Sequence, residues 1–295
     1  MAEPGILLVD KPGGMTSHDV VSRARKALGT RKIGHAGTLD PMATGLLLLG
    51  VEGATRLLTF IVGLDKTYEA TIRLGAATDT DDAEGRTTST TDAATVASER
   101  IAEQITALTG RISQVPSTYS AIKVDGRRAY DLARAGEQVE LKSREVTVSR
   151  FDVLSERREG PFIDLDVVVD CSSGTYIRSL ARDLGAALGV GGHLTALRRT
   201  RIGPFDLQDA VVADAIADAT LLTPAAVATA VLGRLDVSAE EARDLRHGKR
   251  LGGAAERLPT TPTAAVGPDG TLVGIVERRG ADVKSVMNMP EEAPR

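Results

Sequence analysis

Gly34-His-Ala-Gly-Thr-Leu-Asp40-Pro-Met-Ala-Thr-Gly45, together with the four leucines at 46–49 that follow it, is the most informative stretch of this sequence. Its glycines predict a loop over 34–44, and the leucines predict a buried strand that anchors this loop on the core. Pro41 disfavours the helical region for the residue before it, so we expect Asp40 in an extended or turn conformation. The stretch therefore predicts a carboxylate presented on an anchored loop.

The carboxylate of Asp40 has two interpretations. A carboxylate on a loop tied to a rigid strand is a common way to present a nucleophile or a base. The same spacing also fits an Asx turn, in which the Asp40 side chain caps its own loop. The spacing alone leaves both open.

Working outward, the chain mixes strand and helix patterns. Apolar or alternating runs predict strands at 5–10, 68–74, 163–169 and 271–277. Amphipathic runs with end signals predict helices at 20–28, 97–108, 176–188 and 239–247, with a shorter helix inside 120–140. Residues 76–94 are dense in Asp, Thr and Ser and predict a loop, whereas 210–232 is helical in composition and broken at Pro224. The composition changes near residue 233, where we place a domain boundary.

The composition excludes several classes of protein. The 295 residues, 42% of them hydrophobic, suffice for one large domain or for one large and one small domain. No apolar run approaches the ~18–20 residues that span a bilayer, and a secretion signal is missing, so we expect a cytoplasmic protein. Cys171 is the only cysteine, and there is no Walker A motif, no Gly-x-Ser-x-Gly elbow and no His-Glu-x-x-His pair. We therefore expect neither a metal nor a cofactor.

The charge is segregated along the chain, although its net value is only −4. Residues 20–39 carry five basic residues and no acidic one, and 178–201 carry five more against Asp183 alone. Solvated helix faces would explain either cluster by itself. Two clusters that flank candidate chemistry favour a polyanionic partner. With four Phe, four Tyr and no Trp, base stacking can contribute little, so an RNA would be bound through shape and phosphate contacts.

Four motifs in order resemble the TruB-type tRNA pseudouridine synthases. They are Leu8-Val-Asp-Lys-Pro-x-Gly14, the 34–45 stretch, Lys66-x-Tyr68 and Gly174-Thr-Tyr-Ile-Arg178. The resemblance runs in register over about residues 5–201 and is vague beyond 233. It implies a bacterial enzyme that converts uridine 55 in the T loop of tRNA to pseudouridine. This reaction breaks the C1′–N1 bond, turns the uracil and rejoins it through C5, without a redox step or a metal.

The resemblance also implies roles for individual residues. Asp40 matches the nucleophile, which attacks C1′ or uracil C6, and His35 matches a residue that fills the space left by the flipped base. Tyr68 matches a tyrosine that stacks on the uracil, although a core aromatic would look the same. Arg178 matches an arginine that pairs with the catalytic carboxylate; otherwise it would be a surface partner of an acidic neighbour.

Three further positions follow from the same motifs. Tyr176 matches a wall of the uracil pocket, and Leu197 matches a position that lines the uracil site. Lys11, beside Pro12, matches the first motif, where a structural turn and a direct contact are equally good interpretations. The basic segment at 118–142 occupies the place of a loop that grips the tRNA elbow.

The expectation is therefore an α+β protein with a mixed, largely antiparallel sheet flanked by helices. Residues 1–232 would form the catalytic domain and 233–295 a small PUA-like RNA-binding domain. We expect a monomer without a protein partner or a membrane, which acts on the T arm of tRNA and can also assist its folding. Two other classes stay open: an inactive tRNA chaperone, and a nucleoside hydrolase that uses the same carboxylate. The basic 118–142 segment argues against the hydrolase, because a small substrate does not need it.

Overall fold

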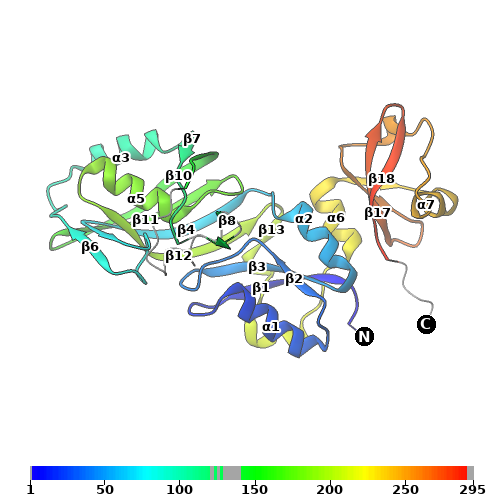
Figure 1. Ribbon diagram of the computed structural model, residues 1–295, viewed down its shortest axis with the longest axis horizontal. Coiled ribbons are helices and arrows are strands. Elements are labelled where there is room, and N and C mark those ends of the chain that lie inside the picture. The colour runs from blue at the N-terminus through cyan, green and yellow to red at the C-terminus, as the bar shows by residue number, and fades with distance from the viewer. Residues whose placement is uncertain (1, 120–122, 125–126, 129–140, 291–295) are drawn as a thin grey trace. The chain divides into compact units, whose positions relative to one another are not determined.

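The protein, seen here in a computed structural model, is described at residues 2–119, 123–124, 127–128 and 141–290 (Figure 1). Its chain divides into two compact units. The first unit contains Met1–Pro41, Gly45–Val62 and Gly203–Arg295, and the second contains Met42–Thr44 and Gly63–Ile202. The chain thus leaves the first unit directly after the Asp40-Pro41 pair.

The N-terminal part of the first unit is a small sheet covered by one helix. Strand β1 (Gly5–Lys11) runs antiparallel to β3 (Thr44–Val51), β2 (Ile33–Ala36) pairs with β3, and β14 (Val211–Val212) pairs with β1. Helix α1 (Ser17–Leu28) begins at a capping box between Thr16 and Asp19 and ends at Gly29, whose φ of 64° suits glycine. Its apolar face packs on leucines and valines of β1 and β3. The sheet and α1 form the base that carries Asp40.

The prediction of a loop over 34–44 is wrong at its two ends. Residues 34–36 belong to β2 and Thr44 begins β3, so the connection shortens to 37–43. Gly34 lies opposite Gly50, and a Cβ on either would come within 3.1 Å or less of an atom in 55–58. That segment lies in two short helical turns, η1 (Glu52–Leu57) and α2 (Leu58–Ile61). These glycines therefore serve close packing within a strand pair rather than loop flexibility.

The second unit is an antiparallel sheet with helices packed on it. Its strand order is β12 (Gly192–Ile202), β4 (Lys66–Leu74), β11 (Phe162–Cys171), β10 (Arg144–Glu159) and β7 (Gly110–Gln114). Helix α5 (Ile177–Leu188) packs against β12 and against α3 (Ser98–Ala107) (Figure 1). At one point α5 approaches β12 so closely that a Cβ on Gly185 would lie 2.1 Å from the Gly192 nitrogen.

Several strands of the second unit were not predicted. The expected loop at 76–94 contains a strand pair, β5 (Ala76–Thr78) with β6 (Thr87–Thr90). Strands β10 and β12 carry many charged residues, so a hydrophobic pattern does not reveal them. Within 120–140 the structure describes only β8 (Lys123–Val124) and β9 (Arg127–Arg128), which pair with each other. The rest of the short helix expected there lies outside the described residues.

The remainder of the first unit leads to a separate small sheet. Short elements come first: β13 (Phe205–Asp206), η2 (Leu207–Asp209) and η3 (Ala213–Asp218). The prediction that Pro224 breaks a helix is wrong: Pro224 begins α6 (Pro224–Leu232), because a first-turn position needs no amide hydrogen. After α6 come β15 (Arg234–Asp236), α7 (Ala239–Arg246), η4 (Ala255–Arg257), β16 (Thr263–Val266), β17 (Leu272–Arg279) and β18 (Asp282–Asn288).

These last four strands form one sheet with an apolar core of its own, to which α7 contributes. The domain boundary near 233 stays a prediction. The α+β fold with a largely antiparallel sheet is confirmed. Among the described residues, no helix is long and apolar enough to cross a membrane.

Candidate active site

The backbone on either side of Asp40 is held by hydrogen bonds from the α1 region. The Ser17 hydroxyl donates to the Leu39 carbonyl oxygen at 3.1 Å and accepts from the Leu39 N–H at 2.9 Å. On the other side, the Gly14 N–H donates to the Pro41 carbonyl oxygen at 2.9 Å. Asp40 itself is partly exposed. The structure thus presents this carboxylate on a loop that is fixed immediately before and after it.

Lys11 completes this arrangement from within the core. Its side chain is fully buried, and its ammonium donates to the carbonyl oxygens of Pro12 (2.9 Å), Met15 (2.7 Å) and Pro41 (3.2 Å). These bonds use the three hydrogens of a lysine ammonium. Of the two interpretations of Lys11, the structural one is confirmed, because the side chain ties the turn at 12–15 to the residue after Asp40.

His35 lies in strand β2, opposite Leu49, and not in the loop itself as the sequence predicted. Its side chain is partly exposed. It precedes Asp40 by five positions in the chain, and both belong to the first unit. A strand position orients a side chain more firmly than a loop position does, because the ladder of β2 with β3 fixes the backbone.

Tyr68 and Leu197 lie on adjacent strands of the second unit. Tyr68 lies on β4, opposite Arg199 of β12, and Leu197 lies opposite Ala70. Each side chain is 8% exposed. Thr44, four residues after Asp40, donates its hydroxyl to the Leu197 carbonyl oxygen at 3.4 Å and accepts from the Arg198 guanidinium at 3.2 Å. The chain that carries Asp40 is therefore bonded, a few residues further on, to the strand that carries Leu197.

Arg178 is a buried residue at the start of α5, so the interpretation as a surface residue is wrong. Its guanidinium lies 3.3 Å from Asp82, and the two side chains are 4% and 5% exposed. It also donates to the carbonyl oxygens of Thr80 and Tyr119, each at 2.8 Å. One turn later, Arg182 faces Asp81 at 3.4 Å, which confirms that the two arginines share one face of the helix. These ion pairs fix α5 to the 79–84 loop, and the expected pairing of Arg178 with Asp40 stays a prediction.

Tyr176 is held at the N-terminus of the same helix. The buried side chain of Gln114 bonds to it twice, accepting from its N–H at 2.9 Å and donating to its carbonyl oxygen at 3.1 Å. The guanidinium of Arg144 lies over its ring, 4.9 Å from the centroid, at cation–π distance. The ring is partly exposed, as a wall of a pocket would be.

Comparison with known proteins assigns this chain to a family. The TruB family pseudouridylate synthase N-terminal domain matches residues 25–177, the tRNA pseudouridylate synthase B C-terminal domain matches 178–241, and the tRNA pseudouridine synthase II C-terminal domain matches 232–290. The chain belongs to the TruB family of pseudouridylate synthases. Members of the TruB family are isomerases.

The relatives align with this TruB family member over nearly its whole length. The tRNA pseudouridine synthase B of Leifsonia xyli subsp. xyli is 57% identical over 99% of this chain and 98% of its own. That of Nocardia farcinica is 58% identical over 94% and 90%. Among solved structures, an H/ACA RNP bound to a substrate RNA containing 2′-deoxyuridine matches with a TM-score of 0.71 at 24% identity, covering 97% of this chain and 85% of that one. A Cbf5-Nop10-Gar1 complex matches with a TM-score of 0.69 at 24% identity over 98% and 84%, and these two show the pseudouridine synthase fold.

Several residues that support the candidate site were not identified from the sequence. Ser17 holds Leu39, Gln114 holds Tyr176, and Asp82 faces Arg178. Ser17 precedes the helix predicted at 20–28, and Asp82 falls within the loop predicted at 76–94. No spacing signal could have identified them, because their partners lie far away in the sequence.

Lys66 of the Lys-x-Tyr motif, to which the sequence assigns no role, is unusual because it is a buried lysine. Its side chain is buried on β4, and its ammonium donates to the Leu64 carbonyl oxygen at 2.5 Å. Burial, together with the smaller effect of the nearby positive charge of Arg199, lowers its pKa to about 8. The neighbouring Cys171 thiol is buried too, and burial raises its pKa to about 11.

We expect the folded protein to gain stability as the pH rises from about 8 to 9. In this range folded Lys66 loses its proton while unfolded Lys66, with a pKa of 10.5, keeps it, so deprotonation favours the fold. Above pH 9 the unfolded Cys171 thiol ionises first, which lowers stability and offsets the gain. Urea unfolding at pH 7.5, 8.5 and 9 should therefore show a rise for the unaltered protein and a flatter profile for Lys66→Met. Equal profiles would contradict the prediction, and Cys171→Ala is the control that should extend the rise above pH 9.

Proposed function

We propose that this protein converts uridine 55 in the T loop of tRNA to pseudouridine in the cytoplasm, with Asp40 as the nucleophile. The observation that supports Asp40 most directly is the fixing of its loop on both sides, by Ser17 at Leu39 and by Lys11 and Gly14 at Pro41. A nucleophile must be held within a fraction of an ångström of its productive position, and such a loop provides this. The substrate follows from the curated relatives, which are named tRNA pseudouridine synthase B.

The proposed reaction is an isomerisation, so the substrate and product have the same atoms. Apart from the Asp40 carboxylate, it needs only protons exchanged with water. The Asp40 carboxylate attacks C1′ or uracil C6, the C1′–N1 bond breaks, and the freed uracil turns within the site. A bond then forms between C1′ and C5 as the bond to Asp40 breaks and returns the free carboxylate, the C5 hydrogen leaves as a proton, and N1 gains a proton. The uracil must first leave the loop stack, at a cost of a few kcal/mol.

The proposal assigns roles to residues of both units. In the first unit, His35 fills the space that the flipped base leaves. In the second, Tyr68 stacks on the uracil, Tyr176 and Leu197 line its pocket, and Arg178 keeps the catalytic carboxylate ionised. The burial of Tyr68 and Leu197 and the fixed backbone of Tyr176 support pocket roles. The cationic side chain of Arg178, itself held by several bonds, supports an orienting role.

The test is release of tritium from unmodified tRNA labelled at C5 of its uridines. We expect one equivalent of tritium per tRNA, and none from a transcript with cytidine at position 55. A tRNA chaperone leaves the C5 hydrogen in place, and a nucleoside hydrolase releases free base without exchange at C5. Binding without tritium release would overturn the proposed activity, and release from the position-55 control would overturn the proposed target.

His35→Ala should slow the modification of full tRNA more than that of a short flexible RNA with the same uridine. The folded T arm collapses back into the gap unless a side chain occupies it, whereas a flexible RNA spends less on extrusion. Single-turnover rates on the two substrates measure this difference. If both rates fall by the same factor, His35 acts on the chemical step or only supports its strand.

A further inference from the structure

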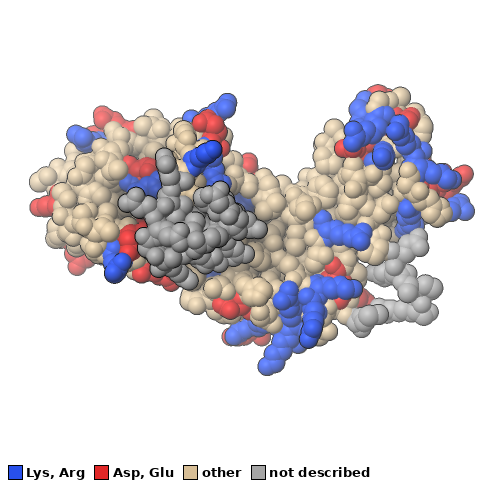
Figure 2. All heavy atoms as spheres, in the orientation of Figure 1, with Lys and Arg blue, Asp and Glu red and all other residues tan. Residues whose placement is uncertain are grey.

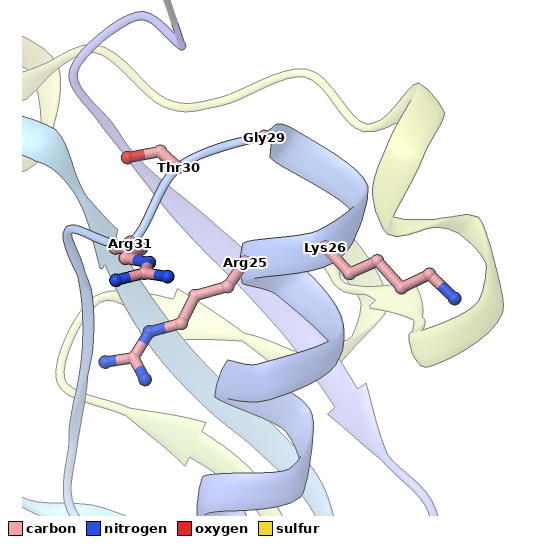
Figure 3. A pocket seen from close by; sticks show the side chains of 5 residues that line it. All are labelled: Arg25, Lys26, Gly29, Thr30 and Arg31. Atoms are coloured by element: carbon pink, nitrogen blue, oxygen red, sulfur yellow. The ribbon is translucent and has the colours of Figure 1, made fainter.

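A pocket lies at the C-terminal end of α1, in the first unit. It has a volume of about 670 Å³ and is lined by Arg25, Lys26, Gly29, Thr30 and Arg31 (Figure 3). Figure 3 shows the guanidinium groups of Arg25 and Arg31 on the same side of the helix end, while the Lys26 side chain points away from them. Lys and Arg side chains also gather over α1 on the face seen in Figure 2.

The cations of this pocket lack counter-charges. In the part of the chain that the structure describes, no carboxylate lies within ion-pair distance of Arg25, Lys26 or Arg31. Their neighbours are different: Arg23 pairs with Asp214, and Lys32 pairs with Glu52 at 3.3 Å. Carboxylates of the protein thus neutralise Arg23 and Lys32, whereas the described residues supply no carboxylate to the three cations that line the pocket.

Arg25 also has an unsatisfied donor. One of its terminal nitrogens donates to the Ile33 carbonyl oxygen at 3.1 Å, but its Nε is buried and bonds to no acceptor among the described residues. A buried N–H without an acceptor costs about 1–3 kcal/mol. Guanidinium groups present parallel N–H donors that match phosphate oxygens, so a phosphate here would meet donors of a suitable kind.

The helix end itself provides a weaker explanation of these cations. Basic residues in the last turn of a helix gain about 0.3–1 kcal/mol from its dipole. This explains Arg25 and Lys26, which lie in that turn, but it does not explain Arg31, which follows the helix. The dipole also places only about half a negative charge at this end, which three cations outweigh.

The pocket and Asp40 belong to the same unit, and strand β2 connects them along the chain. Arg25 bonds to Ile33, the first residue of β2, and β2 leads through His35 to the Asp40 loop. Four strand residues span roughly 13 Å. A nucleic-acid duplex carries a phosphate about every 3.4 Å of each strand, so an RNA with its target base at Asp40 has phosphates at this range.

We propose that the Arg25–Arg31 pocket binds a backbone phosphate of the substrate RNA, in the stem beside the target nucleotide. The inference rests on the proposed function, because it takes the RNA to be bound with its uridine at Asp40. Such a contact positions the RNA without reading its sequence. The pocket therefore contributes to affinity and to its salt dependence, and not to the chemical step.

The test compares Arg31→Gln with Lys32→Gln, the adjacent residue whose charge is already paired. Filter binding of a T-arm hairpin RNA is measured between 50 and 200 mM salt, with folding checked by circular dichroism. For Arg31→Gln we expect the slope of log affinity against log salt to flatten by about one unit. The affinity would then fall about three- to fourfold less between 50 and 200 mM salt than it does for the unaltered protein. Lys32→Gln should change the slope little. Equal slopes for the two variants would overturn the proposal.

Two further measurements separate this proposal from its alternatives. Arg25→Lys keeps the charge but not the fork of donors, so we expect weaker binding with an unchanged salt slope. If inorganic phosphate at millimolar concentration competes equally with the RNA in the unaltered protein and in Arg31→Gln, the pocket is not the phosphate site. A flattened slope without any tritium release from the unaltered protein would leave the pocket in place and overturn the proposed activity instead.

Discussion

Replacing Asp40 by Asn is expected to lower the single-turnover rate of pseudouridine formation by roughly 10⁴-fold or more, as loss of a catalytic carboxylate or nucleophile does in other enzymes. The amide keeps the shape of the side chain but cannot act as a nucleophile. The bonds that fix the loop come from Ser17, Gly14 and Lys11 to the backbone of Leu39 and Pro41, so this substitution leaves them in place. The affinity for tRNA should therefore stay within a few fold.

Two measurements check this result. Tritium release in a single turnover gives the rate, and filter binding with the same tRNA gives the affinity. Ser17→Ala is the informative companion, because it removes the support of Leu39 and leaves the carboxylate. We expect a smaller loss of rate for Ser17→Ala than for Asp40→Asn. Residual activity of Asp40→Asn within tenfold of the unaltered protein would remove Asp40 from the role of nucleophile.

The second large effect is on stability, at the buried pair of Arg178 and Asp82. Asp82→Ala should lower the free energy of unfolding by about 3–5 kcal/mol, because a buried guanidinium then loses the carboxylate 3.3 Å away. Asp82 also accepts hydrogen bonds from the Thr80 hydroxyl at 2.6 Å and the Glu84 N–H at 3.1 Å, so its loss loosens the loop as well.

Urea unfolding of the single and double variants measures this effect. Arg178→Met combined with Asp82→Ala should cost less than the sum of the single changes, because the double variant no longer buries the charge. The exposed pair of Arg234 and Asp236, 2.7 Å apart, is the matched control, and Asp236→Ala should cost no more than about 1 kcal/mol. A cost of 1 kcal/mol or less for Asp82→Ala would show that the buried pair contributes little.

The local predictions succeeded where one segment carries its own signal. The helices predicted at 20–28 and 239–247 are present as α1 and α7; capping boxes at Thr16 and Ser238 begin them, and Gly29 ends α1. These signals act over three or four residues, so they can be identified in the sequence alone. The predictions failed where a distant partner decides the structure. The glycine pattern predicts a loop at Gly34, but this residue lies in a strand opposite Gly50. The sequence places Arg199 in a basic cluster, but it is a buried residue of β12.

The residue pattern alone was enough to predict the helices at 20–28, 97–108, 176–188 and 239–247, a carboxylate before a proline, and the ordered motifs that resemble one family. It was enough because these features depend on short-range sterics, on capping and on residue identity. The bonds to the backbone on either side of Asp40 are visible only in the folded protein. The same is true of the burial of Lys11, whose ammonium makes three hydrogen bonds, and of the ion pair between Arg178 and Asp82. The fold also pairs Arg23 and Lys32 with carboxylates, while none of the described carboxylates lies within ion-pair distance of Arg25, Lys26 or Arg31. Burial and charge pairing depend on residues that are far apart in the chain, and they are therefore settled only when the chain folds.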